Sequence, residues 1–345
     1  MADTETKTPL EANGDTIAEI KALVDALPDA GSGGGDTNPT AASKAVNFID
    51  YDGTIRYSYT LDEIVALTAL PALPVHDGLV CQGWNWTLAD IKALGREATV
   101  GAVYITDDGK TRLYITIDQT DRMTVPIWLS QAVANGVTVD WGDGSAVETS
   151  ETAGSEIQFS HTYAMTGDYV IKLEVVSGAV TLGQAYDMVE EGYITGGLFG
   201  DYGTSVYSGM LTKVEVGSAA IGFAISAFCG CESLRSITLP NGFGNALPKQ
   251  FANESGIDSI TLPGSVASIP ATAFDGANIS SISIPKSVTA IGASAFRETN
   301  CRIIAFPDGI KTIPDTISGN NLVRIIFPSS VTSIGESSSG GGVLE

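Results

Sequence analysis

The chain has few of the residues that form disulfides or hold metal ions. Its 345 residues include four cysteines and two histidines. Cys81, Cys229, Cys231 and Cys301 show no framework spacing, which favours buried thiols in a reducing place of synthesis over disulfides. A structural zinc site needs four ligands, and the two histidines are isolated in sequence. We therefore expect no metal and no cofactor.

Basic residues are also scarce. The chain holds 18 Lys and Arg against 40 Asp and Glu, for a net charge of −22. Nucleic-acid binding needs clustered cations, and anionic lipid repels this charge, so neither partner is expected. The acidity is uneven, because residues 211–335 contain eight acids and eight bases.

Long apolar runs are missing as well. No segment approaches the roughly 18 uninterrupted apolar residues of a membrane-spanning helix. Residues 1–10 are polar and acidic, without the basic start and apolar stretch of a secretion signal. We expect a protein without a membrane span that is made in the cytoplasm. Release would then follow incorporation into a virus particle; an export signal that has been removed is the alternative.

Catalytic motifs are lacking too. The sequence contains no nucleophile elbow, Walker loop, dinucleotide fingerprint or zinc-protease motif. The adjacent acids Glu190 and Glu191 are better explained as a solvated face than as an acid/base pair. The sequence therefore predicts no enzyme, with a cell-wall glycan hydrolase as the least favoured alternative. Calcium binding is less favoured than a turn-forming role for four acids: Asp50, Asp52, Asp107 and Asp108.

Residues 1–45 are predicted to form an anchor helix and a linker. Asp15 can cap a helix that ends before Pro28, and five glycine and serine residues follow at 31–35. A lone helix of this length is marginal in water, so its apolar face should pack on a partner or on copies of the chain. We expect a homo-oligomer anchored through these residues: Ile17, Ile20, Leu23, Val24 and Leu27.

Residues 46–122 are predicted to form a small α+β domain. Two segments, 48–55 and 103–110, each read as a strand that enters an Asp-Gly hairpin turn. Thr60 and Thr87 can each cap a short helix, with an acid three residues later. Trp84 and Trp86 are expected in the core before the second helix; stacking on a sugar is the less favoured alternative.

Residues 123–180 are predicted to form a β-sandwich. Alternating apolar residues indicate strands at 137–141 and 169–175. The series Val139-Asp140-Trp141-Gly142-Asp143-Gly144, then His161-Thr162-Tyr163, resembles the polycystic-kidney-disease (PKD) type domain, an immunoglobulin-like sandwich. The resemblance implies a spacer or a weak binding module, with Trp141 in the core and with Asp143 and His161 bracing turns.

The last third of the chain repeats. Five apolar runs end in prolines spaced 23, 22, 22 and 21 residues apart: Pro240, Pro263, Pro285, Pro307 and Pro328. Such an interval predicts a solenoid, assigned to residues 181–335 and regular from 211, before a flexible tail at 336–345. Phenylalanines recur with the prolines and should form an inner column: Phe228, Phe251, Phe274 and Phe296. The fifth coil, 313–317, has no phenylalanine, which predicts irregular stacking there.

The outward side chains of the repeated strands are the predicted binding face. They change along the array from the charged pair Lys213 and Glu215 through hydroxyl to apolar residues. The predicted binding residues are Ser236, Thr238, Ser259, Thr261, Ser281, Ser283, Ile303, Arg324 and Ile326. A Ser/Thr ladder can bind a glycan or a protein edge, although polar solvated strand faces are common. With no capping repeat beside them, exposed Ile303 and Ile326 suggest a subunit contact; a further coil or loop that folds over them is the alternative.

The segments Leu-Arg-Ser-Ile-Thr-Leu-Pro, Ile-Asp-Ser-Ile-Thr-Leu-Pro and Ile-Ser-Ser-Ile-Ser-Ile-Pro resemble the BspA-like (Treponema-type) leucine-rich repeat family over residues 211–335. That family implies surface adhesins. The whole arrangement is similar to leucine-rich-repeat proteins of phages and prophages of gut Firmicutes. The resemblance implies a virion-surface protein that binds a host glycan or protein and joins a capsid or tail protein through its amino terminus; a bacterial cell-surface adhesin is the alternative.

Overall fold

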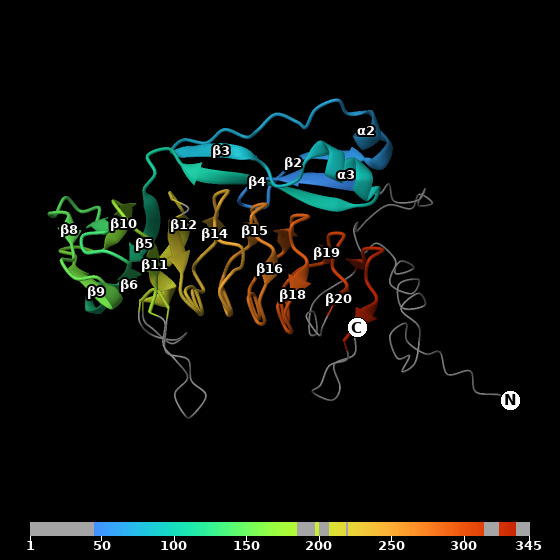
Figure 1. Cartoon of the computed structure of the whole chain (residues 1–345). Helices are drawn as coiled ribbons and strands as arrows, with labels where there is room; N and C mark the ends of the chain where they lie inside the picture. Colours follow the sequence, from blue (N-terminus) through green and yellow to red (C-terminus); the bar gives the residue numbers. More distant parts are fainter. Residues whose placement is uncertain (1–44, 185–196, 200–206, 219, 314–323, 336–345) are drawn as a thin grey trace.

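The computed structural model describes residues 45–184, 197–199, 207–218, 220–313 and 324–335. The protein is mainly β, as the sequence predicts (Figure 1). Neither described helix is long and apolar enough to cross a membrane. Several predicted features lie outside the described residues: the anchor helix with Ile17, Ile20, Leu23, Val24 and Leu27, the pair Glu190 and Glu191, and the tail 336–345.

The amino-proximal unit is a four-stranded sheet with two helices. Its strand order is β2-β1-β4-β3, and β1 and β4 are parallel. The elements are β1 (Ala45–Ile49), β2 (Ile55–Thr60), α2 (Leu61–Ala66), β3 (Leu79–Trp84), α3 (Leu88–Leu94) and β4 (Ala98–Thr106). Both predicted caps are confirmed: Thr60 forms a full capping box with Glu63, and Thr87 accepts a hydrogen bond from the Asp90 amide (3.1 Å). We call residues 45–106 the α+β unit.

The two Asp-Gly turns have different outcomes. The first joins β1 and β2 in an antiparallel hairpin, as predicted. The second hairpin is wrong, because β4 stays in the α+β unit while β5 (Thr111–Ile117) enters another sheet. Alternate residues of β5 are buried, and its two edges pair with β10 and β12. The glycine supplies a turn in both places, but the partners of the outgoing strand decide whether a hairpin forms.

The next unit is a sandwich of two sheets. One is the segment β12-β5-β10-β7-β8 of an eight-stranded sheet, and the other has the order β13-β11-β6-β9. The further strands are β6 (Thr124–Gln131), β7 (Val137–Asp140), β8 (Glu148–Thr149), β9 (Gly154–Thr162), β10 (Gly167–Val175), β11 (Val180–Leu182), β12 (Leu211–Glu215) and β13 (Ile221–Phe223); the 3-10 turns are η1 (Thr120–Arg122) and η2 (Ser208–Met210). The strands predicted at 137–141 and 169–175 are confirmed by β7 and β10, with Trp141 directly after β7.

The repeated segments stack as parallel strands that continue the sandwich sheet. β14 (Ser236–Thr238), β15 (Ser259–Thr261) and β17 (Ser281–Ser283) follow β12 in register. One hydrophobic core extends from Leu113 in the sandwich to Val331 in the last coil. The sandwich therefore caps the first coil, because β5 occupies the edge that a preceding repeat would fill. We call residues 211–335 the repeat array.

The predicted phenylalanine column is present. Phe228, Phe251, Phe274 and Phe296 are fully buried, with successive ring centroids 5.3, 6.2 and 5.7 Å apart. The main ladder stops after β17, since β19 (Ile303–Ala305) pairs with β21 (Arg324–Ile326) and not with β17. A second ladder on the side of the array stops at the same level: β16 (Ser268–Ile269) pairs with β18 (Ala290–Ile291), and β20 (Thr312–Ile313) with β22 (Ser333–Ile334).

Candidate functional site

The predicted binding face is largely buried. Ser236, Thr238, Ser259, Thr261, Ser283 and Ile326 are each at most 8% exposed, and Ser281 and Arg324 are partly buried. Ile303 alone remains open, at 48% exposure. The expectation that these side chains face solvent is wrong, and with Ile326 covered the predicted apolar subunit patch is reduced to Ile303.

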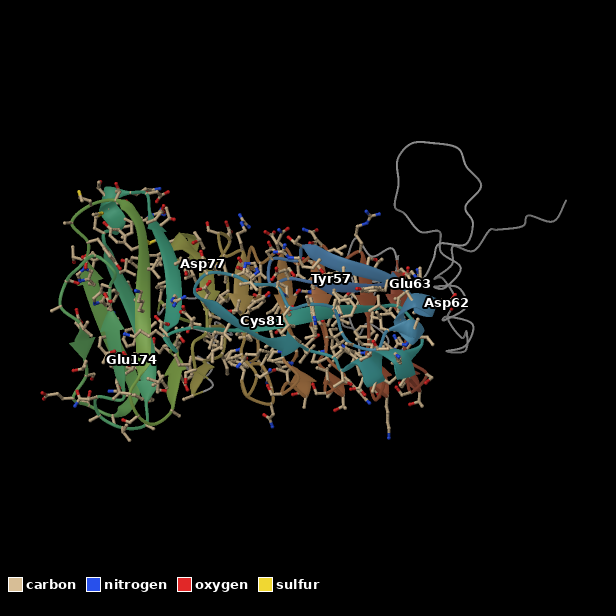
Figure 2. The ribbon with its side chains drawn as sticks, turned by 90° about the horizontal axis from the view of Figure 1, so that it is seen from above. Tyr57, Asp62, Glu63, Asp77, Cys81 and Glu174 are labelled. Atoms are coloured by element: carbon tan, nitrogen blue, oxygen red, sulfur yellow. The ribbon has the colours of Figure 1, made fainter. Side chains whose placement is uncertain are left out.

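The α+β unit is what covers this face. Figure 1 shows it lying along the array, and Figure 2, seen from above, shows Tyr57 and Cys81 over the stacked coils. β4 crosses the strands so closely that a Cβ added at Gly101 would overlap Thr261. A Cβ at Gly53, in the β1–β2 turn, would lie 2.9 Å from Ser259 Cβ. The small serine and threonine side chains thus serve close approach of a second layer of the same chain.

Hydrogen bonds fasten this cover to the array. The Asn85 amide donates to the Leu262 carbonyl (2.9 Å), and Ser283 Oγ donates to the Thr99 carbonyl (2.6 Å). The Trp86 indole donates to the Ile284 carbonyl (3.1 Å). These hydrogen bonds replace the bonds to water that the buried polar groups lose. Separating the two units would break them.

Ion pairs hold the rim of the same interface. Arg96 donates to the Phe306 carbonyl (2.7 Å) and lies 3.2 Å from Asp308. Two further pairs join the units: Lys286 with Asp90 (2.6 Å) and Arg324 with Glu97 (2.9 Å). Arg324, predicted as a binding residue, is therefore engaged within the chain.

The cover is tied down at its other end as well. Only residues 107–110 connect β4 to β5, and Arg112 at the start of β5 donates to the Gly78 carbonyl (2.9 Å) and pairs with Asp107 (2.8 Å). A connection this short keeps this end of the α+β unit within about 15 Å of β5. The strand face is consequently an internal interface.

The interface leaves some hydroxyls without partners. Thr238 Oγ1, Ser259 Oγ and Thr261 Oγ1 are buried and make no hydrogen bond within the described structure. Each such group costs about 1–3 kcal/mol of desolvation. This supports a steric reason for small side chains here, because their hydrogen-bonding capacity is not used.

Asp50 forms the polar cluster that most resembles a catalytic site. It is fully buried and accepts hydrogen bonds from Tyr104 (2.6 Å) and Arg56 (2.7 Å), with His76 Nε2 2.9 Å away. Burial raises the pKa of Asp50, but these bonds outweigh it and hold the pKa below the ordinary value. Burial also raises the pKa of the neighbouring Cys81 thiol, which disfavours the nucleophilic thiolate. The cluster is suited to holding the chain between β1 and β3 and poorly suited to proton transfer.

The other three acids that were considered for calcium binding also form contacts within the fold. Asp52 accepts the Thr54 amide (2.9 Å), and Asp108 accepts the Lys110 amide (3.1 Å). Asp107 and Asp108 both pair with Arg112. No group of three or more metal-ligating side chains occurs among the described residues. The turn-forming role is confirmed by these hydrogen bonds for Asp52 and Asp108, whereas the Asp107 side chain contacts Arg112.

The tryptophans and the sandwich motif have the structural roles that were predicted. Trp86 is 5% exposed, and Trp84 packs on the α+β core while its indole donates to the Pro71 carbonyl (3.0 Å). Trp141 is fully buried, and its indole stacks on His161 with centroids 5.1 Å apart. Asp143 lies 2.7 Å from His161 Nε2 and accepts the Ser145 amide, so it braces the turn after β7.

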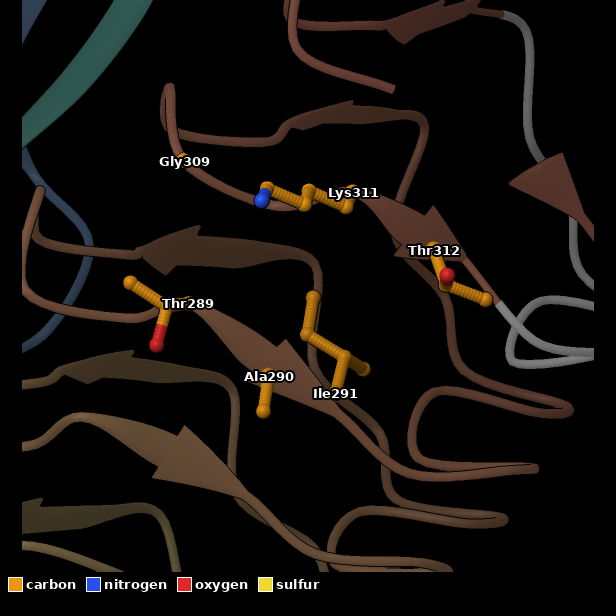
Figure 3. Close-up of a pocket in the computed structure, with 6 residues that line it drawn as sticks. All are labelled: Thr289, Ala290, Ile291, Gly309, Lys311 and Thr312. Carbon is orange, nitrogen blue, oxygen red and sulfur yellow. The ribbon is translucent and has the colours of Figure 1, made fainter. Parts of the chain in front are cut away.

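One side of the array is a regular surface that remains exposed in the described part of the chain. We call it the lateral face; its exposed residues are Thr289, Ala290, Lys311, Thr312, Thr332 and Ser333. Between β18 and β20 it contains a groove of about 420 Å³ (Figure 3). The lining offers two hydroxyls, one ammonium group and aliphatic carbons: Thr289, Ala290, Ile291, Gly309, Lys311 and Thr312. Sequence reasoning missed this site because it considered only the strands that end in proline.

Comparison with known proteins identifies the repeats. Residues 206–317 match the family described as BspA type leucine rich repeat region, in six copies. The match covers about a third of the chain, so the repeated segment is similar to BspA-type leucine-rich repeats. No curated protein and no solved structure matches the chain.

Proposed function

We propose that the protein is a non-enzymatic attachment protein whose BspA-type repeats bind a glycan or protein on a cell surface. The observation that carries this is the arrangement of the array: its strand face is sealed by the α+β unit and its first coil by the sandwich. The array is thereby covered on two sides, and a regular, hydroxyl-bearing lateral face stays exposed on another. Repeat proteins use such extended surfaces for binding.

We further propose a place on the surface of a phage or prophage virion, with the amino-terminal segment joined to a capsid or tail protein and the PKD-like sandwich as a spacer. The support is the resemblance of the whole arrangement to phage leucine-rich-repeat proteins and the glycine-rich stretch at residues 31–35. Such a protein would be made in the host cytoplasm and multimerise on the particle. Electron microscopy of particles carrying a label near residue 330 tests this; a label found only on bacterial envelopes would refute it.

A bacterial cell-surface adhesin is the second candidate. The BspA-type repeat match favours it, because that family implies surface adhesins. Fractionation of the producing bacterium separates the two: an adhesin stays with the envelope, whereas a virion protein sediments with particles after lysis.

Attachment itself is tested by binding of the fluorescently labelled full chain to intact bacteria. The proposal expects saturable binding that periodate or protease treatment of the cells removes. The matched variant Thr312→Glu places a bulky anion on the lateral face, and Thr149→Glu makes the same exchange on the exposed edge of the sandwich. Loss of binding in the first variant and retention in the second is expected; equal binding by both would place the contact elsewhere.

A further inference from the structure

The groove between β18 and β20 exists because the lateral ladder is interrupted. In the coils on either side, the Gly292 amide donates to the Ile269 carbonyl (2.8 Å) and the Gly335 amide donates to the Ile313 carbonyl (2.7 Å). The equivalent bond to the Ile291 carbonyl would need an amide hydrogen on residue 314, which is proline. The interruption therefore leaves a backbone acceptor at the groove without its ladder donor.

The groove has the size and mixed polarity of a small-ligand site. Its volume of about 420 Å³ lies within the usual range for ligand pockets. Thr289 and Thr312 are both exposed and line the groove from opposite sides, and Ile291 also lines it with aliphatic carbons. Figure 3 shows the Lys311 side chain running back toward Gly309, with Thr289 and Ile291 across the groove. Hydroxyls can both donate and accept, so the site suits a ligand with many hydroxyl groups.

Lys311 is the one charged residue of this lining. Within the described part of the chain it forms no ion pair, while the nearby Asp308 is paired with Arg96. An ammonium group with three donors and no acid partner is complementary to a carboxylate. The net charge of −22 resides mainly outside the array and is screened beyond about 8 Å at physiological salt.

We propose that this groove binds a sugar that carries a carboxylate, a uronic-acid-type unit, with the carboxylate on Lys311 and ring hydroxyls on Thr289, Thr312 and the Ile291 carbonyl. The inference rests on the proposed attachment function and names its ligand class. The groove has no aromatic platform, so a single site should bind with a dissociation constant on the order of 1 mM. Several copies on one particle would then supply avidity.

The test titrates the full chain with methyl β-D-glucuronide and with its neutral counterpart, methyl β-D-glucoside, followed by ligand-observed NMR. We expect the glucuronide to bind about ten-fold more tightly, with the preference declining as salt rises. Lys311→Gln should abolish the preference and Lys311→Arg should keep most of it. Lys249→Gln is the matched control, because Lys249 is exposed in an earlier coil and lies outside the groove.

Three results would overturn the inference: equal binding of the two sugars, binding of neither, or a preference that survives in Lys311→Gln. Circular dichroism of each variant confirms that loss of binding is not loss of folding. The proposed attachment function has a separate test, because it requires only that the full chain bind intact cells. If the chain binds cells but not glucuronide, the attachment function is supported and the acidic-sugar site in the groove is refuted.

Discussion

Replacing Gly101 with alanine should weaken the contact between the α+β unit and the repeat array. The added Cβ would lie within 3 Å of three Thr261 atoms, Oγ1, Cγ2 and Cβ. Gly101 is not among the glycines with positive φ, so alanine is compatible with its backbone. The clash is therefore the main effect of the substitution.

The magnitude follows from two opposing terms. Overpacking a tight interface typically costs about 1–3 kcal/mol. Alanine also gains about 0.5–1 kcal/mol over glycine in a strand by restricting the unfolded chain. The midpoints of these two ranges give a net loss in free energy of unfolding of about 1 kcal/mol, measured from urea denaturation. Hydrogen exchange should rise in β4 and in β14, β15 and β17.

Two controls make the measurement specific. Gly154→Ala adds the same methyl group where no atom lies within 4 Å, and it should be neutral or slightly stabilising. Thr261→Ala removes a hydroxyl that has no hydrogen-bond partner and should relieve part of the Gly101→Ala loss in the double variant. If Gly101→Ala retains wild-type stability and protection in β4, the close packing of β4 on the repeat strands is refuted.

Three further changes probe other parts of the fold. Glu298 has φ +55°, a left-handed conformation that is strained for a residue with a side chain, and two other coils have glycine at the matching turn position. Glu298→Gly should therefore raise the free energy of unfolding by about 0.5–1 kcal/mol. An unchanged or lower melting temperature would show that the backbone at Glu298 is not strained. Hydrogen bonds from Ser145 and His161 lower the pKa of Asp143 to about 2, below its ordinary value near 3.8; its stabilisation is therefore complete above about pH 4 and is lost as the pH falls through about 2. In acid titrations of unfolding, Asp143→Asn should remove that part of the pH dependence, and a profile identical to wild type would disprove the assignment. Trp86→Phe leaves a buried carbonyl of the repeat strand without its donor and should cost about 1–3 kcal/mol, seen as a lower urea midpoint; no change would mean that the bond contributes nothing.

Local chemistry determined much of this fold from sequence alone. The 21- to 23-residue proline spacing predicted coils whose strands pair in parallel register, such as Ser259 with Ser281. Thr60 and Thr87 predicted helix starts, because capping depends on residues only three positions apart. Trp141, Asp143 and His161 likewise had their roles predicted from a short motif. Each of these features depends on neighbours in sequence or on a regular period.

Tertiary structure decided which surfaces are free. Ser259 and Thr261 alternate like solvent-facing strand residues, yet β4 of the same chain, about 160 residues earlier, covers them. Gly101 and Asn85 are the residues that permit and hold this cover, and neither has a local sequence signal that names its partner. Long-range pairing also decided the place of β5, which pairs with β10 and β12 instead of forming the expected hairpin with β4. Through this pairing the sandwich caps the array. Periodicity specifies that a strand has an outer face, whereas what packs on that face depends on contacts between segments that are distant in sequence.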